Sequence, residues 1–467
     1  MGVEEEYGRL AGLDKARVWH PFTQMREWAA EDPLIVSEGR GCFLKDTRGR
    51  WYLDGVSSLW VNIHGHRRRE IDDAIRAQLD RVAHSTLLGQ GNVPSIELAG
   101  RLVEAVADSL SGGTPVLTRV FYSDNGSTAV EVALKMAFQY WRLRGQEGRD
   151  SFVSLENGYH GDTLGAVSVG GVDLFHSAYR PLLFKAHKAP SPYCYRCGLG
   201  LRPESCSMAC LGKMEDILRE RGSEIAAVIV EPLVQAAGGM IVAPRGYLRG
   251  VRGLCAKYGV LMIADEVATG FGRTGRMFAC EHEGVVPDII CLSKGITGGY
   301  LPLAATVATE EVYEAFLGEF RELKTFFHGH SYTGNQLGCA AALASLDIFR
   351  RDRTLERLGP KIGLLEGWLE EARGLPHVGD ARNAGFICGV ELVRDKASRE
   401  PYPFEEKMGY RVAWALRERG VLIRPLGNVL VIMPPLAIEA GDLETMLRHV
   451  AASIEEVTER QGAASAG

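Results

Sequence analysis

The sequence predicts an α/β protein with a large domain around a mostly parallel sheet and a smaller α+β domain built from both chain ends. In the middle of the chain, short apolar segments alternate with segments whose apolar residues recur at helical spacing. Near the start, strand-like pieces separated by turns (LIVSEGRGCFLKDTRGRWYLDG) favour a small antiparallel meander. Beyond about residue 345, the pattern reads helix, strand, helix, strand.

The middle region contains the predicted strands of the large sheet. Several are apolar and β-branched throughout, as expected of strands that helices cover on both faces. After the first strand, apolar residues from Val130 to Trp141 recur at helical spacing and predict a helix. We expect residues 1–75 and 346–467 to form the small domain and 76–345 the large one. The predicted strands are Arg119–Ser123, Ser151–Leu155, Ala226–Val230, Val260–Ala264 and Ile289–Leu292.

Composition and charge exclude several classes of function. A formal net charge of −6 gives no electrostatic reason to expect binding to nucleic acid or to an anionic membrane. The start, MGVEEEYGRL, lacks the apolar run of a signal peptide. No stretch reaches the roughly 18 uncharged apolar residues that a membrane helix needs. We therefore expect a cytoplasmic protein that acts on small molecules.

Two polar residues directly follow predicted strands. Asp265 comes after Val260–Ala264, and Lys294 comes shortly after Ile289–Leu292; glycines follow both. In open α/β sheets, ligands bind at the carboxyl ends of the strands. A lysine there can bind the aldehyde of pyridoxal phosphate, and a carboxylate can keep the ring nitrogen protonated. Taken singly, Asp265 is equally typical of a helix cap or turn, and a lysine in the position of Lys294 is much more often a solvated surface charge.

Two further segments supply the remaining parts of such a site. SDNGSTAVEVALKMA places Gly126 and Ser127 where a strand meets a helix, and the N–H groups of a helix start bind anions such as phosphate. Ordinary capping by Asn125 or Ser127 explains the same residues. In NGYHGDT, Tyr159 can stack on a flat ring or belong to the core. This chemistry needs no metal ion.

Together these segments resemble the class III aminotransferases. DEVATGFGRTG, SKGITGGYLP, SDNGSTAVEVALKMA, NGYHGDT and HSYTGNQLGCAAA carry the resemblance, which covers nearly the whole chain. It implies a transferase of fold type I whose large domain binds pyridoxal 5′-phosphate. WHPFTQM, SSLWVNIHGH and the alanine of DEVATG further resemble the corresponding segments of the family branch that acts in biotin biosynthesis. That branch transfers an amino group to 8-amino-7-oxononanoate, with S-adenosylmethionine as the expected donor.

The resemblance also implies which residues hold the cofactor. Lys294 would bind it covalently and move the proton between donor and cofactor, and Asp265 would bind the pyridine nitrogen. Val267 and Tyr159 would pack on opposite ring faces. Ser331 would reach the phosphate bound by a neighbouring subunit, which implies a homodimer with active sites at the subunit interface. The catalytic residues would be Lys294, Asp265 and Tyr159, and the cofactor-binding residues Gly126, Ser127, Tyr159, Asp265, Val267, Lys294 and Ser331.

Substrate binding is implied in the same way. Trp60 would line the substrate site, and Arg273 would help to order it. Arg424 would receive the carboxylate of the keto acid, a function suited to its planar guanidinium, although a surface ion pair explains it equally. The full expected set is Trp60, Tyr159, Arg273, Gly329, Lys294 and Arg424.

The amino donor and the reaction type have alternatives. Relatives that use S-adenosylmethionine often carry a tyrosine where this chain has Phe22, so lysine is the alternative donor. An ω-amino acid or 4-aminobutyrate aminotransferase would keep the chemistry with another substrate. An intramolecular aminomutase and a non-catalytic cofactor-binding regulator are the rivals from other classes.

A cysteine-rich segment lies outside this chemistry. Four of the ten cysteines fall between Pro190 and Lys213. Their spacing is compatible with a zinc or iron–sulfur site. Only eight residues separate the two pairs and no histidine joins them, so we expect reduced thiols and no bound metal, with a structural metal as the alternative. The four are Cys194, Cys197, Cys206 and Cys210.

Overall fold

A seven-stranded mixed sheet forms the centre of the large lobe. In this computed structural model, which describes residues 2–465 and the side chains of 2–459, the strand order is β4-β12-β11-β10-β7-β5-β6. β12 runs antiparallel to both of its neighbours, and the other neighbouring pairs are parallel. The strands are β4 (Leu117–Ser123), β5 (Ser151–Leu155), β6 (Ala186–Ala189), β7 (Ile225–Val230), β10 (Leu261–Asp265), β11 (Ile289–Leu292) and β12 (Ala304–Thr309).

All the predicted strands of this sheet are present, with small shifts at their ends, so the prediction of a mostly parallel sheet is confirmed. The sequence did not reveal β6 or β12. β12 reads AATVAT, and its alanines have little intrinsic preference for a strand. It is buried between β4 and β11, so pairing on both sides decides its conformation.

Both faces of the sheet are covered, which explains why its central strands are apolar throughout. Val228 of β7 and Met262 of β10 join one core cluster. Ile229 and Ile263, the next residues along, join a second cluster with the apolar face of α6 (Gly126–Leu143). Successive side chains of a strand point to opposite faces, so a strand between two helical layers needs apolar residues at every position.

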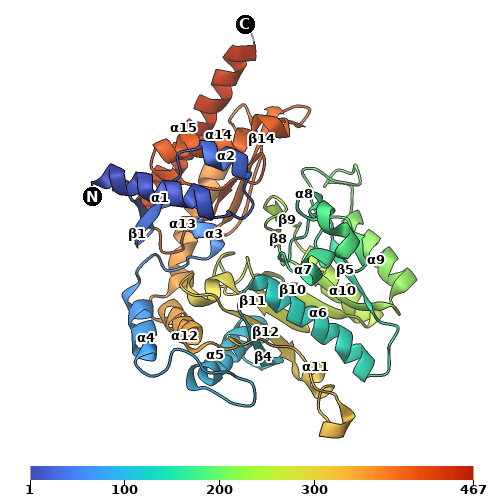
Figure 1. The fold of residues 1–467 in the computed structure, drawn as a ribbon. Coiled ribbons are helices and arrows are strands. Elements are labelled where there is room, and N and C mark those ends of the chain that lie inside the picture. Colours follow the sequence, from blue (N-terminus) through green and yellow to red (C-terminus); the bar gives the residue numbers. More distant parts are fainter. Residues whose placement is uncertain (1, 466–467) are drawn as a thin grey trace.

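The two chain ends meet in the small lobe. β1 (Val36–Arg40), β2 (Phe43–Asp46) and β3 (Trp51–Asp54) form the predicted antiparallel meander. β16 (Val421–Leu422) pairs parallel with β3 and joins the C-terminal part to it. Figure 1 shows the N-terminal helices beside the C-terminal ones in this lobe. The domain boundaries at residues 75 and 345 stay predictions.

The remaining elements complete both lobes. A further sheet contains β13 (Val378–Ala384), β14 (Ile387–Asp395), β15 (Glu400–Pro401) and β17 (Val429–Ile432), and β8 (Val234–Gln235) pairs with β9 (Ile241–Val242). Within the described part of the chain, no helix combines the length and apolar character that a bilayer span requires. The other α-helices are α1 (Val3–Arg17), α2 (Met25–Ala30), α3 (Ser57–Trp60), α4 (Arg69–Leu79), α5 (Val93–Leu110), α7 (Leu164–Val169), α8 (Asp173–His176), α9 (Ala209–Arg221), α10 (Tyr247–Tyr258), α11 (Glu310–Glu314), α12 (Gln336–Arg351), α13 (Thr354–Ala372), α14 (Met408–Glu418) and α15 (Ala440–Ser465).

The cysteine-rich segment forms mostly irregular structure between β6 and α9. Its four thiols are partly buried and line one small hollow. All ten cysteines are free of disulfides. Among the described residues, no group of three or more His, Cys, Asp or Glu side chains is arranged so that it could hold a metal ion.

The buried centre of β10 gives a stability prediction. Ile263 is fully buried, so Ile263→Ala should lower the free energy of unfolding by about 2–5 kcal/mol, because it removes apolar contacts and leaves a cavity. Urea unfolding followed by circular dichroism measures this. The control is Leu79→Ala at the end of α4, where the side chain is 52% exposed and the loss should stay small. Equal losses in both variants would contradict the two-sided packing of β10.

Candidate active site

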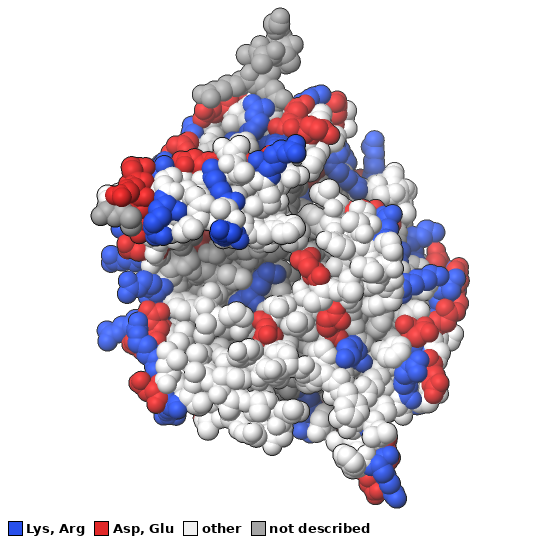
Figure 2. Space-filling view, viewed as in Figure 1, with Lys and Arg blue, Asp and Glu red and all other residues white. Residues whose placement is uncertain are grey.

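A cavity of about 430 Å³ opens where β10 and β11 end. The carboxyl ends of parallel strands meet at one edge of the sheet, and ligands bind in the crevice there. Figure 2 shows that the surface is hollowed between the two lobes. Residues from distant parts of the chain line the cavity, among them Trp60, Asn125, Gly126, Ser127, Tyr159, His160, Glu231, Asp265, Val267, Lys294 and Tyr300.

Lys294 begins the short 3₁₀ helix η3 (Lys294–Thr297) directly beyond β11. Its φ is 45°, in the left-handed region that non-glycine residues adopt at a cost of order 1 kcal/mol. Its Nζ lies 5.4 Å from the centre of the Trp60 ring. Burial lowers the pKa of the Lys294 ammonium, against the opposing charges of Asp265 and Glu231. A lowered pKa enlarges the neutral, nucleophilic fraction of the amine.

The carboxylate of Asp265 is held in place from two sides. It is the last residue of β10 and is only 3% exposed. Nδ1 of His160 donates to Oδ2 at 2.7 Å, and the N–H of Val267 donates to Oδ1 at 3.1 Å. Each carboxylate oxygen has a further lone pair, so Asp265 can still accept a hydrogen bond from a protonated ring nitrogen in the cavity.

Glu231 is a second buried carboxyl group in the cavity wall, just beyond β7. It accepts hydrogen bonds from the N–H groups of Tyr159 (3.0 Å) and Ala236 (2.9 Å). Burial raises the pKa of Glu231 to about 7, and the nearby charge of Asp265 adds to the rise. Neither Glu231 nor His160 was predicted from the sequence. The only available signals were the histidine next to Tyr159 and the acidic residue that ends an apolar strand.

The start of α6 forms an anion site on the cavity wall. The side chain of Asn125 caps the helix by accepting the N–H of Thr128 at 3.1 Å. The first two N–H groups of a helix have no partner within it, and here they belong to Gly126 and Ser127. Capping and anion binding are therefore compatible, because they use different N–H groups.

Close packing around this helix start requires glycine. A Cβ on Gly126 would lie 2.5 Å from Cγ1 of Val267, which lines the same cavity. A Cβ on Gly161 would lie 2.0 Å from Oγ of Ser127, and the φ of Gly161 is 119°. Because Gly126 and Gly161 leave this space free, Val267 and Ser127 stand at the cavity wall, where they can contact a flat ring and its phosphate.

The other expected site residues lie outside this cavity wall. Arg273 is 1% exposed and donates to the carbonyl groups of Pro434 (2.7 Å) and Asn62 (2.8 Å). It therefore links the C-terminal and N-terminal parts of the chain. Arg424 lies beyond β16, and its Nη2 donates to O of Phe22 at 3.4 Å. Gly329 and Ser331 are exposed on the loop before α12.

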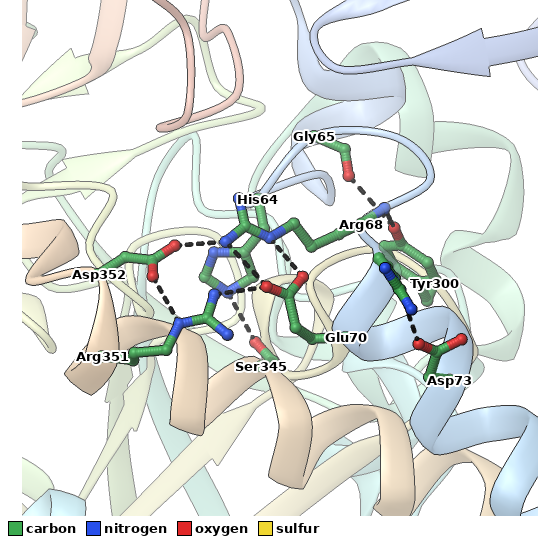
Figure 3. Close-up of polar contacts among 10 residues, drawn as sticks. His64, Gly65, Arg68, Glu70, Asp73, Tyr300, Ser345, Arg351 and Asp352 are labelled. Atoms are coloured by element: carbon green, nitrogen blue, oxygen red, sulfur yellow. Dashed lines mark hydrogen bonds and ion pairs between the residues drawn. The ribbon is translucent and has the colours of Figure 1, made fainter.

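An ion-pair network supports the cavity wall at Tyr300 (Figure 3). The Tyr300 hydroxyl accepts the backbone N–H of Arg68 at the start of α4. Nε of Arg68 donates to Glu70 at 2.8 Å. Arg351, the last residue of α12, binds Glu70 at 2.6 Å and Asp352 at 2.8 Å. The network connects α4 and α12, and its Arg68 contacts the Tyr300 hydroxyl.

Comparison with known proteins identifies the family. The model of the family described as "Aminotransferase class-III" matches residues 25–454. The chain belongs to the class III aminotransferases. Enzymes of this family depend on pyridoxal 5′-phosphate, so the predicted cofactor and reaction class are confirmed.

Individual relatives agree with this assignment. The chain is 59% identical to the adenosylmethionine-8-amino-7-oxononanoate aminotransferase of Nitratidesulfovibrio vulgaris, over 97% of this chain and 82% of that protein. It is 56% identical to the enzyme of the same name from Geobacter sulfurreducens, over 96% and 98%. The crystal structure of the Methanocaldococcus jannaschii enzyme of that name aligns with a TM-score of 0.91 and 48% identity, over 96% of this chain and 99% of that one. The predicted fold is thereby confirmed.

The residues present fit pyridoxal phosphate. The α6 start offers N–H groups to a phosphate, Asp265 offers a carboxylate to a ring nitrogen, and Lys294 offers an amine, all in one cavity. The Nε1–H of Trp60 is buried there without a hydrogen-bond partner among the described residues. That donor remains available to a ligand.

The packing of Gly126 gives a second prediction. Gly126→Ala should weaken cofactor binding about tenfold or more, because the added methyl group must displace Val267 or the helix start. Titration of the apoenzyme with pyridoxal phosphate, followed by absorbance, measures the affinity. Gly100→Ala is the matched control, since a Cβ there meets nothing within 4 Å. Unchanged affinity in Gly126→Ala would refute the proposed phosphate position.

Proposed function

We propose that this enzyme transfers an amino group to 8-amino-7-oxononanoate, giving 7,8-diaminononanoate in biotin biosynthesis, with S-adenosylmethionine as donor. Near-full-length identity of 59% and 56% to two enzymes named for this reaction carries the proposal. The cavity supports it, because its residues fit the cofactor that such a transfer requires.

We assign the chemical roles as follows. Bound pyridoxal phosphate supplies an electron sink that allows the Cα–H of an amino donor to ionise. Lys294 holds the cofactor and, once released, takes the proton from the donor Cα and returns it, a step helped by its lowered pKa. Asp265 keeps the ring nitrogen protonated, because an opposite charge favours the cation. Tyr159 and Val267 restrict the ring from its two faces.

The substrate end of the site lies toward the small lobe. Arg424 holds the backbone of Phe22 by a long hydrogen bond of 3.4 Å, and a carboxylate with two parallel contacts can replace that bond. The ring of Phe22 lies edge-on to Phe175 at 5.2 Å, and Phe175 lies edge-on to Tyr159 at 6.2 Å. Trp60 lines the cavity, while Arg273 orders the site by donating to the carbonyl groups of Pro434 and Asn62.

The homodimer is part of the same proposal. Ser331 would reach the phosphate bound by a second copy, and Gly329 would line that copy's substrate site. Apolar side chains that favour an interface include Phe327 and Tyr332 on the same loop and Leu88 ahead of α5. Figure 2 shows few charged side chains on the face below the hollow, near α5 and β4. The cytoplasmic location likewise stays a prediction.

Lys294→Ala tests the lysine assignment. The variant should lose the visible absorption of the lysine-bound cofactor, because no other amine is expected to bind the cofactor aldehyde at this position. Absorbance of the purified variant with added pyridoxal phosphate measures this, with the surface variant Lys257→Ala as the control. A spectrum like that of the unchanged enzyme would show that another residue binds the cofactor.

Asp265→Asn tests the charge partner. The amide keeps the shape but not the charge, so the variant should retain cofactor and lose turnover by roughly a hundredfold or more. Single-turnover measurements with amino donor separate chemistry from binding. Near-normal rates would remove Asp265 from the role of charge partner.

A donor panel tests the substrate. With 8-amino-7-oxononanoate as acceptor, S-adenosylmethionine should give 7,8-diaminononanoate, and lysine should give little. Mass spectrometry of the product measures both. Product with lysine alone would favour the alternative donor, as the missing hydroxyl at Phe22 suggests.

The chain is also 38% identical to an ω-transaminase from Thermomicrobium roseum whose structure aligns with a TM-score of 0.90. Transfer to pyruvate with no transfer to the oxononanoate would therefore favour the ω-amino acid alternative.

A further inference from the structure

A second cavity lies apart from the first and shares no lining residue with it. It has a volume of about 670 Å³ and lies beside β6, the strand at the free edge of the large sheet. We call it the edge cavity. The ring of His176, which lines it, lies parallel to that of Tyr159, with centres 6.2 Å apart and planes within 12°. The ionisable residues that line it are Glu156, Asp173, His176, Arg180, Lys185 and Lys188.

Lys188 is a partly buried cation whose contacts in this cavity are neutral. Its Nζ donates to Oγ of Ser154 at 2.8 Å and to O of Ser168 at 3.2 Å. An ammonium has three N–H groups, so one is left over. Among the described residues, Lys188 makes no ion pair within 4 Å. Burial lowers the pKa of Lys188 to about 8, as expected of a cation that is withdrawn from water without a counter-charge.

His176 is the second group that needs a partner. Its residue is 5% exposed, and in the described structure neither ring nitrogen has a hydrogen-bond partner. The ring packs over Gly170, where a Cβ would lie 2.3 Å from Cε1. Buried polar groups are nearly always hydrogen-bonded, so such an imidazole indicates a missing ligand or water. Burial lowers the pKa of His176, the nearby charge of Asp162 opposes this, and the charge of Lys188 adds a smaller lowering.

The other charges of the edge cavity leave it positive. Arg180 pairs with Asp173 at 2.9 Å, which neutralises both. Lys185 is exposed at the cavity and adds a cation, and Glu156 is the one remaining acid among the residues that line the cavity. Two lysines and an unpartnered histidine thus face one carboxylate. An anion with several acceptor oxygens would satisfy the free N–H of Lys188, and a rotation of the buried His176 ring would bring one of its unpartnered nitrogens to the same anion.

We infer that the edge cavity is a binding site for a phosphate group, separate from the cofactor phosphate site at the start of α6. A phosphate carries up to two charges and several acceptor oxygens, which suits Lys188 and His176 better than a neutral ligand does. The cavity exceeds the size of one phosphate ion, so the group can belong to inorganic phosphate or to a small phosphate ester. A bound phosphate would restrain His176 and, through it, the stacked ring of Tyr159.

The test uses the holoenzyme, in which bound cofactor fills the α6 site. Titration with inorganic phosphate, followed by calorimetry, should show one saturable site per chain. Lys188→Met should weaken this binding about tenfold or more, because it removes a charge-assisted hydrogen bond. Lys188→Arg, which keeps the charge, should retain most of the affinity. Lys257→Met, on the surface, is the control.

A parallel titration with glycerol 3-phosphate distinguishes the two sources of the phosphate group. Tighter binding of the ester assigns the site to phosphate esters, and tighter binding of the inorganic ion assigns it to free phosphate.

Two results would overturn the inference. One is the absence of saturable binding of either compound to the holoenzyme, which would mean that only water fills the edge cavity. The other is equal affinity in the unchanged enzyme and in Lys188→Met. A measurement without a variant guards against misfolding: the ring C–H signals of His176 in NMR spectra should shift and saturate with phosphate. Unchanged His176 signals at phosphate concentrations that saturate the calorimetric site would also refute it.

Discussion

Withdrawing the Asp265 carboxylate from water is costly unless donors replace the lost hydration. The fold supplies two of them, Nδ1 of His160 and the N–H of Val267, and leaves one side of the carboxylate turned to the cavity. The position of Asp265 at the end of β10, in the middle of the sheet, fixes where that charge stands. Lys294 and the start of α6 line the same cavity, so a pyridine ring bound to Asp265 through its nitrogen would lie near both.

Two further constraints fix the groups that would contact the rest of the cofactor. Lys294 follows β11, the neighbour of β10, so its amine enters the same cavity from the next strand. Gly126 brings α6 so close to Val267 that a methyl group would not fit between them. Arg273 then ties the segments at Asn62 and Pro434 together, which positions Trp60 from the N-terminal part above the cavity. The cavity is therefore lined by Trp60 and Val61 of the N-terminal part together with residues of the large lobe.

The sequence could predict those strands and motifs whose signal lies within a short segment. β5 and β11 read as continuous apolar runs and were predicted with their exact bounds, because strands buried on both faces need such runs. β12 was missed because alanine-rich segments carry no strand signal. The motifs around Lys294, Asp265 and Gly126 pointed to a cofactor site because each combines a strand end with glycines. The partnership of His160 with Asp265 could not be predicted, since 105 residues separate them and only the fold brings them together. The proposed roles of Gly329 and Ser331 came only from the resemblance, since both residues are exposed on a loop and contact no part of the cavity within one chain.

The most direct test of this account is a crystal structure of the enzyme with pyridoxal phosphate bound. We expect the ring nitrogen at about 2.7–3.2 Å from a carboxylate oxygen of Asp265. We also expect the phosphate against the N–H groups of Gly126 and Ser127, with electron density continuous between the cofactor and Nζ of Lys294. A ring nitrogen turned away from Asp265, or a phosphate bound elsewhere than the start of α6, would contradict these assignments.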